Sequence, residues 1–360
     1  MLHLAAAVLT STFATPDVFD TIAFGSCARE RQAQPIWTEI IAQQPDLFLF
    51  IGDNHYADFW LKDGRMVMEP VPNPERIAEA YDALAAKPGY RRMQRACPIM
   101  ATWDDHDYGA NDAGNDFVFR EESKDLFCDF YGFGENHPIR EQQGVYQSRV
   151  FEGPRGERVQ VIVLDTRYNR DPLVKASKEE RETTGRRGPY TATTDTSTTI
   201  LGEEQWAWLE RQFRKPADVR ILASSIQIVA DEHGYETWGN FPHERQRLYD
   251  LIDRTDASGV IAISGDRHLL EISRDAGRGA PYPFWDFTSS GLTQKPGEAL
   301  DANSFRVGPV LRETNFGVIR FEWGETPDQT KIHLEGLGDQ GQMLTRQTVW
   351  LSDLSESASD

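Results

Sequence analysis

Three short apolar segments, each ending in acidic residues, constrain the fold of this chain most strongly. They are DLFLFIGDNHYAD (46–58), ACPIMATWDDHD (96–107) and GVIAISGDRH (259–268). Continuous apolar runs of about four to eight residues are typical of strands buried in an α/β sheet. Ligands bind at the carboxyl ends of such strands, so the acids and histidines that follow them predict one shared site.

Along the chain, strand-like segments alternate with helix-like segments. This alternation predicts a single α/β domain with extra antiparallel strands after about residue 267. Residues 169–200 are poor in apolar side chains and are expected to form a long exposed loop. Strands are expected at 21–27, 47–51, 98–103, 145–151, 158–164, 219–225 and 259–264. Helices are expected at 35–43, 74–95 with a break at Pro88–Gly89, 122–131, 201–213 and 243–253.

The two ends of the chain differ from this pattern. Residues 1–19 contain a short apolar core and resemble either a remnant of a signal peptide or an ordinary N-terminal tail. A genuine signal would place the protein in the periplasm or outside the cell, and its absence would leave it in the cytoplasm. The domain is expected to span 20–351, followed by a disordered tail at 352–360.

The charge balance limits the partners. The chain carries 57 acidic and 38 basic residues, a net charge of −19, which argues against a stable nucleic-acid partner. No segment reaches the roughly 20 apolar residues of a transmembrane helix. There is no CxxC pair among the three cysteines, so a thiolate zinc site is not expected; Cys97 and Cys128 form either a disulfide or two buried thiols.

Asp53 is the strongest candidate ligand, because it follows an apolar strand and a glycine. A carboxylate there can bridge two cations, although a helix N-cap is the alternative. Tyr56 offers a phenolate to a ferric ion, or else it is a packed aromatic residue. Asn54 and His55, like Asp58, are expected to be neighbours of the ligands.

The other two segments add acids and histidines. His106 lies between acids and is a ligand or a proton donor to a leaving group. Asp266 and His268 share one side of an extended segment. Arg167, in LDTRY, either clamps a phosphoryl oxygen or pairs with Asp165.

The segment 224–252 contributes further polar groups. Gln227, Glu232 and His233 are candidates for a remaining metal ligand, whereas Trp238 is expected in the core. Asp104 is expected to support the site rather than to bind metal.

These motifs, taken in order, resemble the PhoD-like alkaline phosphatases of the metallophosphoesterase superfamily. The resemblance covers about residues 20–295 and implies a four-layer α/β/β/α sandwich with mixed sheets. The motifs that carry it are FGSC (24–27), PDLFLFIGDNHYAD (45–58), ATWDDHDYGANDAG (101–114), VIVLDTRY (161–168), SSIQIVADEHGYETWGNFPHERQRL (224–248) and SGDRH (264–268).

The resemblance also implies a metal centre. The metals it implies are Fe³⁺ and Ca²⁺, with a binuclear Zn²⁺, Mn²⁺ or Co²⁺ site as the alternative. It implies that His106 contacts the phosphoryl or leaving group. The metal ligands that it implies are Cys27, Asp53, Tyr56, Asp105, Asp266 and His268.

The activity implied is hydrolysis of small phosphate monoesters, and often diesters, by a metal-activated hydroxide. Two alternatives remain at this stage. One is a phosphodiesterase or phospholipase D-like enzyme on the same scaffold. The other is a non-catalytic metal-binding protein that has kept the fold.

Overall fold

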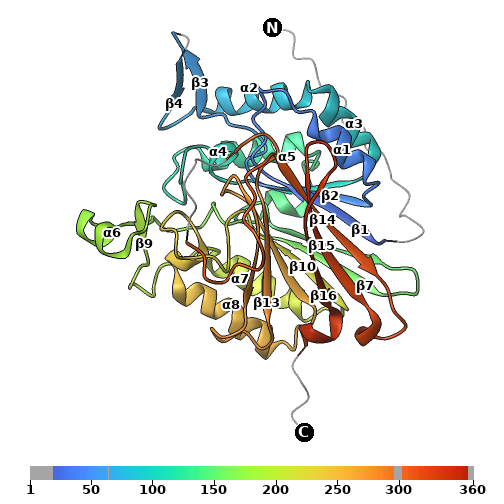
Figure 1. Cartoon of the computed structure of the whole chain (residues 1–360). Helices are drawn as coiled ribbons and strands as arrows, with labels where there is room; N and C mark the ends of the chain where they lie inside the picture. Colours follow the sequence, from blue (N-terminus) through green and yellow to red (C-terminus); the bar gives the residue numbers. More distant parts are fainter. Residues whose placement is uncertain (1–18, 64, 296–301, 356–360) are drawn as a thin grey trace.

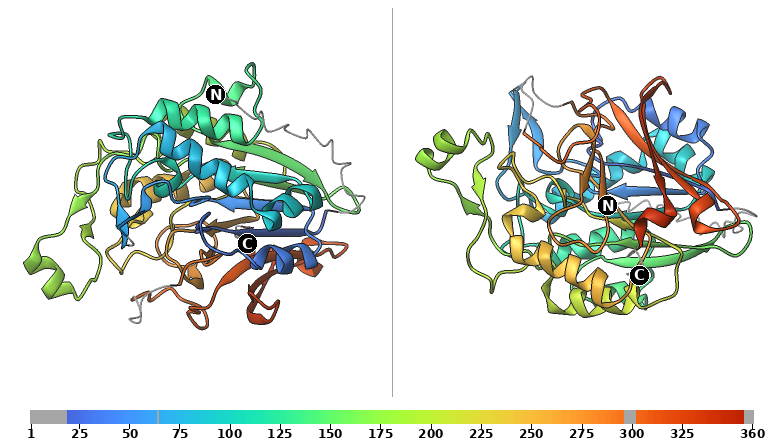
Figure 2. Two further views of the ribbon diagram at one scale, coloured as in Figure 1. Left: turned by 90° about the horizontal axis from the view of Figure 1, so that it is seen from above. Right: turned by 60° about the horizontal axis from the view of Figure 1, so that its bottom comes forward.

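Two six-stranded mixed sheets pack face to face, and helices cover both outer faces (Figure 1). The computed structural model describes residues 19–63, 65–295 and 302–355. The predicted four-layer α/β/β/α sandwich is therefore confirmed, and Figure 2 shows the layers from two other directions. Residues 1–18, most of the predicted N-terminal tail or signal, lie outside the described residues.

The first sheet has the strand order β16-β15-β14-β1-β2-β5. Its three N-terminal strands are parallel, with Ile22 beside Leu47 and Phe48 beside Ile99. The C-terminal strands add to the β1 edge in antiparallel fashion, as predicted. The strands are β1 (Thr21–Gly25), β2 (Leu47–Ile51), β5 (Ile99–Thr102), β14 (Asn315–Glu322), β15 (Lys331–Gly338) and β16 (Met343–Trp350).

The second sheet has the order β12-β13-β11-β10-β7-β6. Its four central strands are parallel, and antiparallel β12 and β6 form the edges. The carboxyl ends of the central strands therefore lie at one end of the sheet. The strands are β6 (Gln147–Glu152), β7 (Arg158–Val163), β10 (Val219–Ala223), β11 (Val260–Ser264), β12 (Leu270–Asp275) and β13 (Phe284–Ser289).

Both faces of the first sheet are buried, because successive residues point to opposite sides of a strand. Leu47 and Leu49 join the core between the sheets, whereas Phe48 and Phe50 join a second core beneath the helices. This double burial explains the uninterrupted apolar runs. The helices on that face are α1 (Ile36–Ala42), α2 (Pro74–Ala85), α3 (Pro88–Ala96) and α5 (Arg120–Phe130), and those on the second sheet are α7 (Gly202–Phe213) and α8 (Pro242–Arg254).

Local signals explain where several helices start and stop. Asn73 caps α2 by accepting a hydrogen bond from Arg76 N at 3.0 Å, and Pro74 follows at the first turn. The predicted break near Pro88 separates α2 from α3. The remaining short helices are α4 (Asp105–Tyr108), α6 (Lys178–Thr184), η1 (Pro138–Arg140), η2 (Trp238–Asn240), η3 (Pro327–Gln329) and η4 (Leu351–Leu354).

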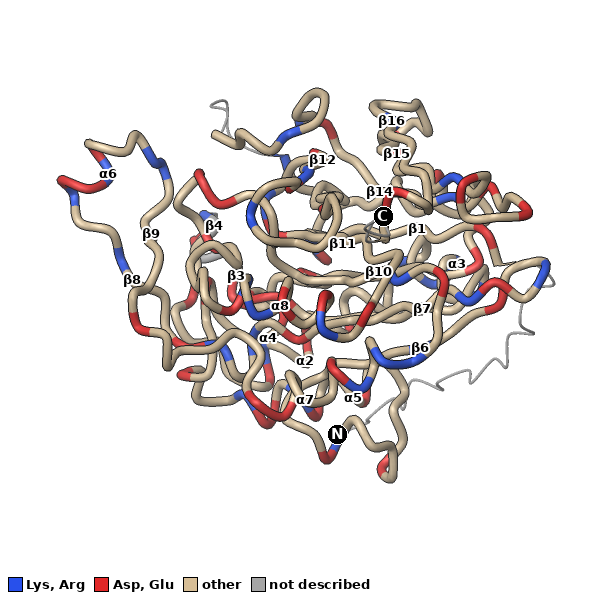
Figure 3. Tube along the Cα trace, turned by 90° about the horizontal axis from the view of Figure 1, so that it is seen from below, with Lys and Arg blue, Asp and Glu red and all other residues tan. Residues whose placement is uncertain are grey.

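Three segments differ from the sequence-based expectations. Residues 169–200 are not a plain loop, since they contain β8 (Val174–Lys175), α6 and β9 (Tyr190–Thr191). These elements project from the body as an arm that carries both basic and acidic residues (Figure 3). An unpredicted hairpin, β3 (Phe59–Lys62) and β4 (Arg65–Met68), projects elsewhere. Residues 352–355 continue the fold instead of beginning a disordered tail, because Leu354 is buried and its carbonyl accepts a hydrogen bond from Gly259.

Two further expectations concern a disulfide and a membrane-spanning helix. Cys97 and Cys128 are buried free thiols, so they form no disulfide. Across the described ranges, no helix combines the length and apolar character needed to cross a bilayer.

Candidate metal centre

The polar residues that follow β1, β2, β5 and β11 converge on one place between the two sheets. Their side chains form groups of three whose potential ligand atoms all lie within 4.8 Å of one another. The groups are Cys27 with Asp53 and His268, Asp53 with Asp105 and His106, Asp104 with Asp105 and Asp266, and Asp105 with Asp112 and Glu236.

The backbone at the centre is bent in an unusual way. Cys27, Asp53, Asp266 and His268 have φ of 65°, 49°, 67° and 58°, in the left-handed region that side chains with a Cβ rarely adopt. Such conformations cost about 1–3 kcal/mol each and cluster at functional sites. Four of the predicted ligands therefore owe their placement to strained turns at strand ends.

Asp107 holds two of these strand ends together. Its carboxylate accepts hydrogen bonds from the backbone N–H of Asp53 at 3.2 Å, Asn54 at 3.1 Å and Asp104 at 2.6 Å. The side chain is wholly buried, so these bonds are shielded from water. Asp107 thereby fixes the turn after β2 against the turn after β5.

Tyr56 lies among the residues of the first group. Its hydroxyl donates to Asp53 Oδ2 at 2.7 Å and lies 3.2 Å from His268 Nε2. Cys27 Sγ lies 3.3 Å from the same Asp53 oxygen. The structure thus brings together one thiol, one phenol, one imidazole and one carboxylate.

His106 is held by a carboxylate on the side away from the ligands. Its Nδ1 lies 2.8 Å from Asp58 Oδ2, which leaves Nε2 available to the site. Burial by itself lowers the pKa of His106, but the carboxylates of Asp105, Asp53 and Asp58 outweigh burial and raise this pKa well above its usual value. A protonated imidazole beside the ligands can donate a proton.

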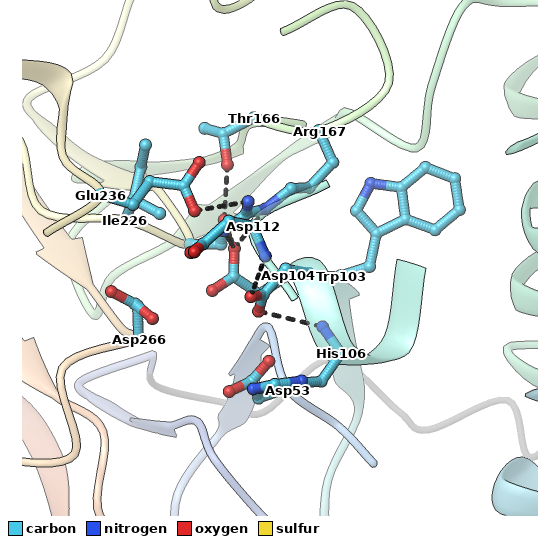
Figure 4. A network of polar contacts seen from close by, with 12 residues as sticks. Asp53, Trp103, Asp104, His106, Asp112, Thr166, Arg167, Ile226, Glu236 and Asp266 are labelled. Atoms are coloured by element: carbon cyan, nitrogen blue, oxygen red, sulfur yellow. Dashed lines mark hydrogen bonds and ion pairs between the residues drawn. The ribbon is translucent and has the colours of Figure 1, made fainter. Parts of the chain in front are cut away.

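Arg167 is wholly buried and engaged by two acids (Figure 4). Its Nε donates to Asp104 Oδ1 at 2.7 Å, and its guanidinium lies 2.6 Å from Glu236 Oε2. Arg170 contacts the other Glu236 oxygen at 2.9 Å. This geometry favours a positioning role for Arg167, through Asp104, while its predicted contact with a phosphoryl oxygen stays a prediction.

Asp112 and Glu236, which the sequence motifs did not indicate as ligands, lie beside Asp105. Asp112 follows the WDDHD motif, and its own N–H donates to Asp105 Oδ2 at 2.7 Å. Two arginines after a buried strand, Arg167 and Arg170, were a signal that a buried acid must lie opposite.

Of the three earlier candidates for the remaining ligand, Glu232 and His233 lie in none of these groups of cysteine, histidine and carboxylate side chains. Gln227 donates to Glu271 and Thr288, and Glu232 binds the backbone and hydroxyl of Ser304. His233 Nδ1 accepts from the backbone of Tyr235 at 3.0 Å.

The donor set fits metal cations. Asp53 Oδ1, Asn54 Oδ1 and Asp104 Oδ2 are buried and have no hydrogen-bond partner. Burial and neighbouring carboxylates raise the pKa of Asp53 well above its usual value, and burial likewise raises that of Asp266. Unpaired buried oxygens and crowded carboxylates are costly without a compensating positive charge, which bound cations would supply.

Comparisons with known proteins point to one family. The family model described as PhoD-like phosphatase matches residues 22–313. Alkaline phosphatase D of Bacillus subtilis (strain 168) is 23% identical over 280 residues, which are 69% of this chain and 46% of that protein. The chain therefore spans about half the length of this curated relative.

Solved structures show the same fold. A structure of PhoD has a TM-score of 0.65 at 16% identity and covers 92% of this chain and 68% of its own. A purple acid phosphatase from yellow lupin (Lupinus luteus) has a TM-score of 0.59 at 14% identity, covering 92% and 53%. The family match extends over most of the sequence and includes every strand end of the centre, so this chain belongs to the PhoD-like phosphatase family.

Proposed function

We propose that this protein is a metal-dependent phosphoesterase that hydrolyses small phosphate monoesters and accepts diesters. The observation that carries the proposal is the convergence of cysteine, carboxylate and histidine side chains from both sheets within 4.8 Å of one another. Membership of the PhoD-like phosphatase family supports the reaction class.

Two kinds of donor lie side by side in the centre. Cys27, Tyr56 and His268 would provide sulfur, phenolate and imidazole donors that suit Fe³⁺, and the carboxylate of Asp53 lies beside them. Asp105 and Asp266 offer only oxygen, as Ca²⁺ prefers. When bound, the cations would polarise the phosphoryl group and lower the pKa of a water molecule.

The protein's own side chains would move the proton. His106 would protonate the leaving oxygen, and Asp58 would hold its ring by the bond to Nδ1. Arg167 would keep Asp104 in place from within the protein.

Replacing the central carboxylate tests this proposal. Asp53→Asn keeps the shape of the side chain but removes a charge, so it should abolish hydrolysis of 4-nitrophenyl phosphate and lower bound metal in elemental analysis. Asp250→Asn removes one charge at an exposed position on α8 and should behave like the unmodified protein. Near-normal turnover by Asp53→Asn would refute the site.

The metal and the ester class need separate measurements. Bound iron with a visible charge-transfer band would support the ferric assignment, whereas a colourless protein with stoichiometric zinc or manganese would replace it. Rates on mono-aryl and bis-aryl phosphates across pH separate a monoesterase from a phosphodiesterase. Metal binding without turnover on any ester would favour the non-catalytic alternative.

A further inference from the structure

Arg29 lies two residues after Cys27, on a backbone that is tightly fixed. Its N–H donates to Thr293 Oγ1 at 2.8 Å, and its carbonyl accepts from Gln34 Nε2 at 3.1 Å. The preceding residue, Ala28, donates its N–H to the carbonyl of Asp53 at 2.9 Å. The Cα of Arg29 is thus anchored to the turn that carries Asp53, so its side chain has a defined position beside the centre.

The guanidinium of Arg29 lies over two aromatic rings next to the predicted ligands. Its carbon is 4.8 Å from the ring centre of Tyr56 and 4.4 Å from that of Phe59. The ring of His106 lies 4.3 Å and 5.3 Å from the same two rings. Arg29 therefore shares an aromatic platform with the predicted proton donor, and Tyr56 connects that platform to Asp53.

No acid neutralises this arginine within the described part of the chain. Among the described residues, no carboxylate oxygen forms an ion pair with Arg29 within 4.0 Å, and its Nε is buried without a hydrogen-bond partner. The neighbouring Glu30 instead pairs with Arg31 and accepts from Tyr56 N at 3.0 Å. A buried N–H without a partner is unfavourable, and contact with ring faces leaves the donor edges of a guanidinium unused.

An anion is the partner that satisfies these donors. Arginine binds phosphoryl oxygens through paired N–H bonds, and the centre is where a phosphoryl group would lie if the proposed function holds. Arg167 is already occupied by Asp104 and Glu236, and it is wholly buried. Arg29 is only partly buried, so it can reach a substrate without breaking an ion pair.

We propose that Arg29 binds the phosphoryl group of the substrate and favours dianionic monoesters over monoanionic diesters. This inference rests on the proposed function. A fixed positive charge stabilises two negative charges more than one, so the discrimination follows from Coulomb attraction alone. The aromatic platform keeps the guanidinium in place between turnovers.

Three variants test this role. Arg29→Gln removes the charge, and Arg29→Lys keeps the charge but loses the paired donors. Arg76→Gln is the matched control, because Arg76 also lies over an aromatic ring, Trp60 at 5.2 Å, but pairs with Glu79. Each is assayed for kcat/KM on mono-aryl and bis-aryl phosphates, for metal content, and for binding of inorganic phosphate by calorimetry on the metal-loaded protein.

The expected result is specific to Arg29. Arg29→Gln should lose about 10- to 100-fold in kcat/KM on the monoester and weaken phosphate binding by about 10-fold, with metal content unchanged. The loss on the diester should be smaller, Arg29→Lys should recover part of the activity, and Arg76→Gln should match the unmodified protein.

Other results would overturn the proposal. Equal losses of kcat/KM on both esters would overturn the proposed preference for monoesters. A kcat/KM and a phosphate affinity of Arg29→Gln within about twofold of those of Arg76→Gln would overturn the contact between Arg29 and the phosphoryl group. If the unmodified protein hydrolyses no ester, the proposed function fails, and phosphate calorimetry still decides whether Arg29 binds the anion. Absence of phosphate binding by the unmodified metal-loaded protein would refute the role of Arg29.

Discussion

Gly52, the residue before Asp53, offers a sharp test of the centre's geometry. Its φ is 102°, and a Cβ built on it would lie 2.5 Å from Asp104 Cβ and 3.1 Å from Ser225 Cβ. Asp104 cannot move away freely, because its carboxylate is bound by Arg167 and by Ser225 Oγ at 2.6 Å. Gly52→Ala should therefore disturb the turns after β2 and β5 together.

Two costs add in this variant. The left-handed backbone costs about 1–3 kcal/mol with a Cβ present. Overlap with a packed neighbour adds about 1–3 kcal/mol. The sum, about 2–6 kcal/mol, corresponds to a fall in Tm of about 3–8 °C for a chain of 360 residues.

Two other glycines separate these costs. Gly156, in the turn between β6 and β7, has φ of 91° but nothing within 4 Å of a built Cβ, so Gly156→Ala carries strain alone. Gly134 has open space and no positive φ, and Gly134→Ala should change the free energy of unfolding by less than about 0.5 kcal/mol. Denaturant unfolding and turnover of an aryl phosphate are measured for all three variants. Equal stability losses at Gly52 and Gly156, with activity kept in both, would refute the close contact with Asp104.

Three further predictions concern charge, proton transfer and the arm. Burial raises the pKa of Asp104 to about 7 and that of Asp53 well above its usual value, so the folded state holds these protons more tightly than the unfolded state. The Tm of chelator-treated protein should therefore fall as pH rises from about 4 to about 7, whereas the Tm of metal-loaded protein should not. Identical dependences of Tm on pH in the two forms would contradict this prediction. Asp58→Asn should lower the pKa of His106 and slow hydrolysis of alkyl phosphates about 10- to 100-fold, with a smaller effect on 4-nitrophenyl phosphate. Equal slowing on the two kinds of ester would exclude a proton-donor role for His106. Ser177→Ala removes the N-cap of α6 and should speed proteolysis within the arm. The global free energy of unfolding should change by less than about 0.5 kcal/mol. An unchanged rate of cleavage would show that the cap is dispensable.

The main elements were predictable because their signals are local. Apolar runs such as Leu47–Ile51 are strands buried on both sides, and Pro88 separates two helices, as expected. The arm was missed although Ser177 and Gly185 are ordinary start and stop signals for α6. That helix has no buried residue, so the apolar periodicity used to predict the other helices is absent there.

The candidate site was predictable where ligands directly follow strands. Asp53 and Asp266 are of this kind: each follows a parallel strand of its own sheet, and the face-to-face packing of the two sheets brings these strand ends to one place. Glu236 is different, because it lies within an irregular segment and reaches Asp105 only through the tertiary fold. Its partners Arg167 and Arg170 come from a distant strand end, and pairing across such separations cannot be read from spacing.

The donors of this centre come from both halves of the sandwich, and this has a mechanical consequence. Asp53 and Asp105 follow strands of the first sheet, whereas Asp266 and His268 follow a strand of the second. Ions held by both sets would act as a cross-link between the sheets, adding their binding free energy to the cohesion of the interface. Removing these ions should increase the rate of amide hydrogen exchange in the facing strands of both sheets at once. Metal supply would therefore set the lifetime of the folded protein as well as its rate of turnover.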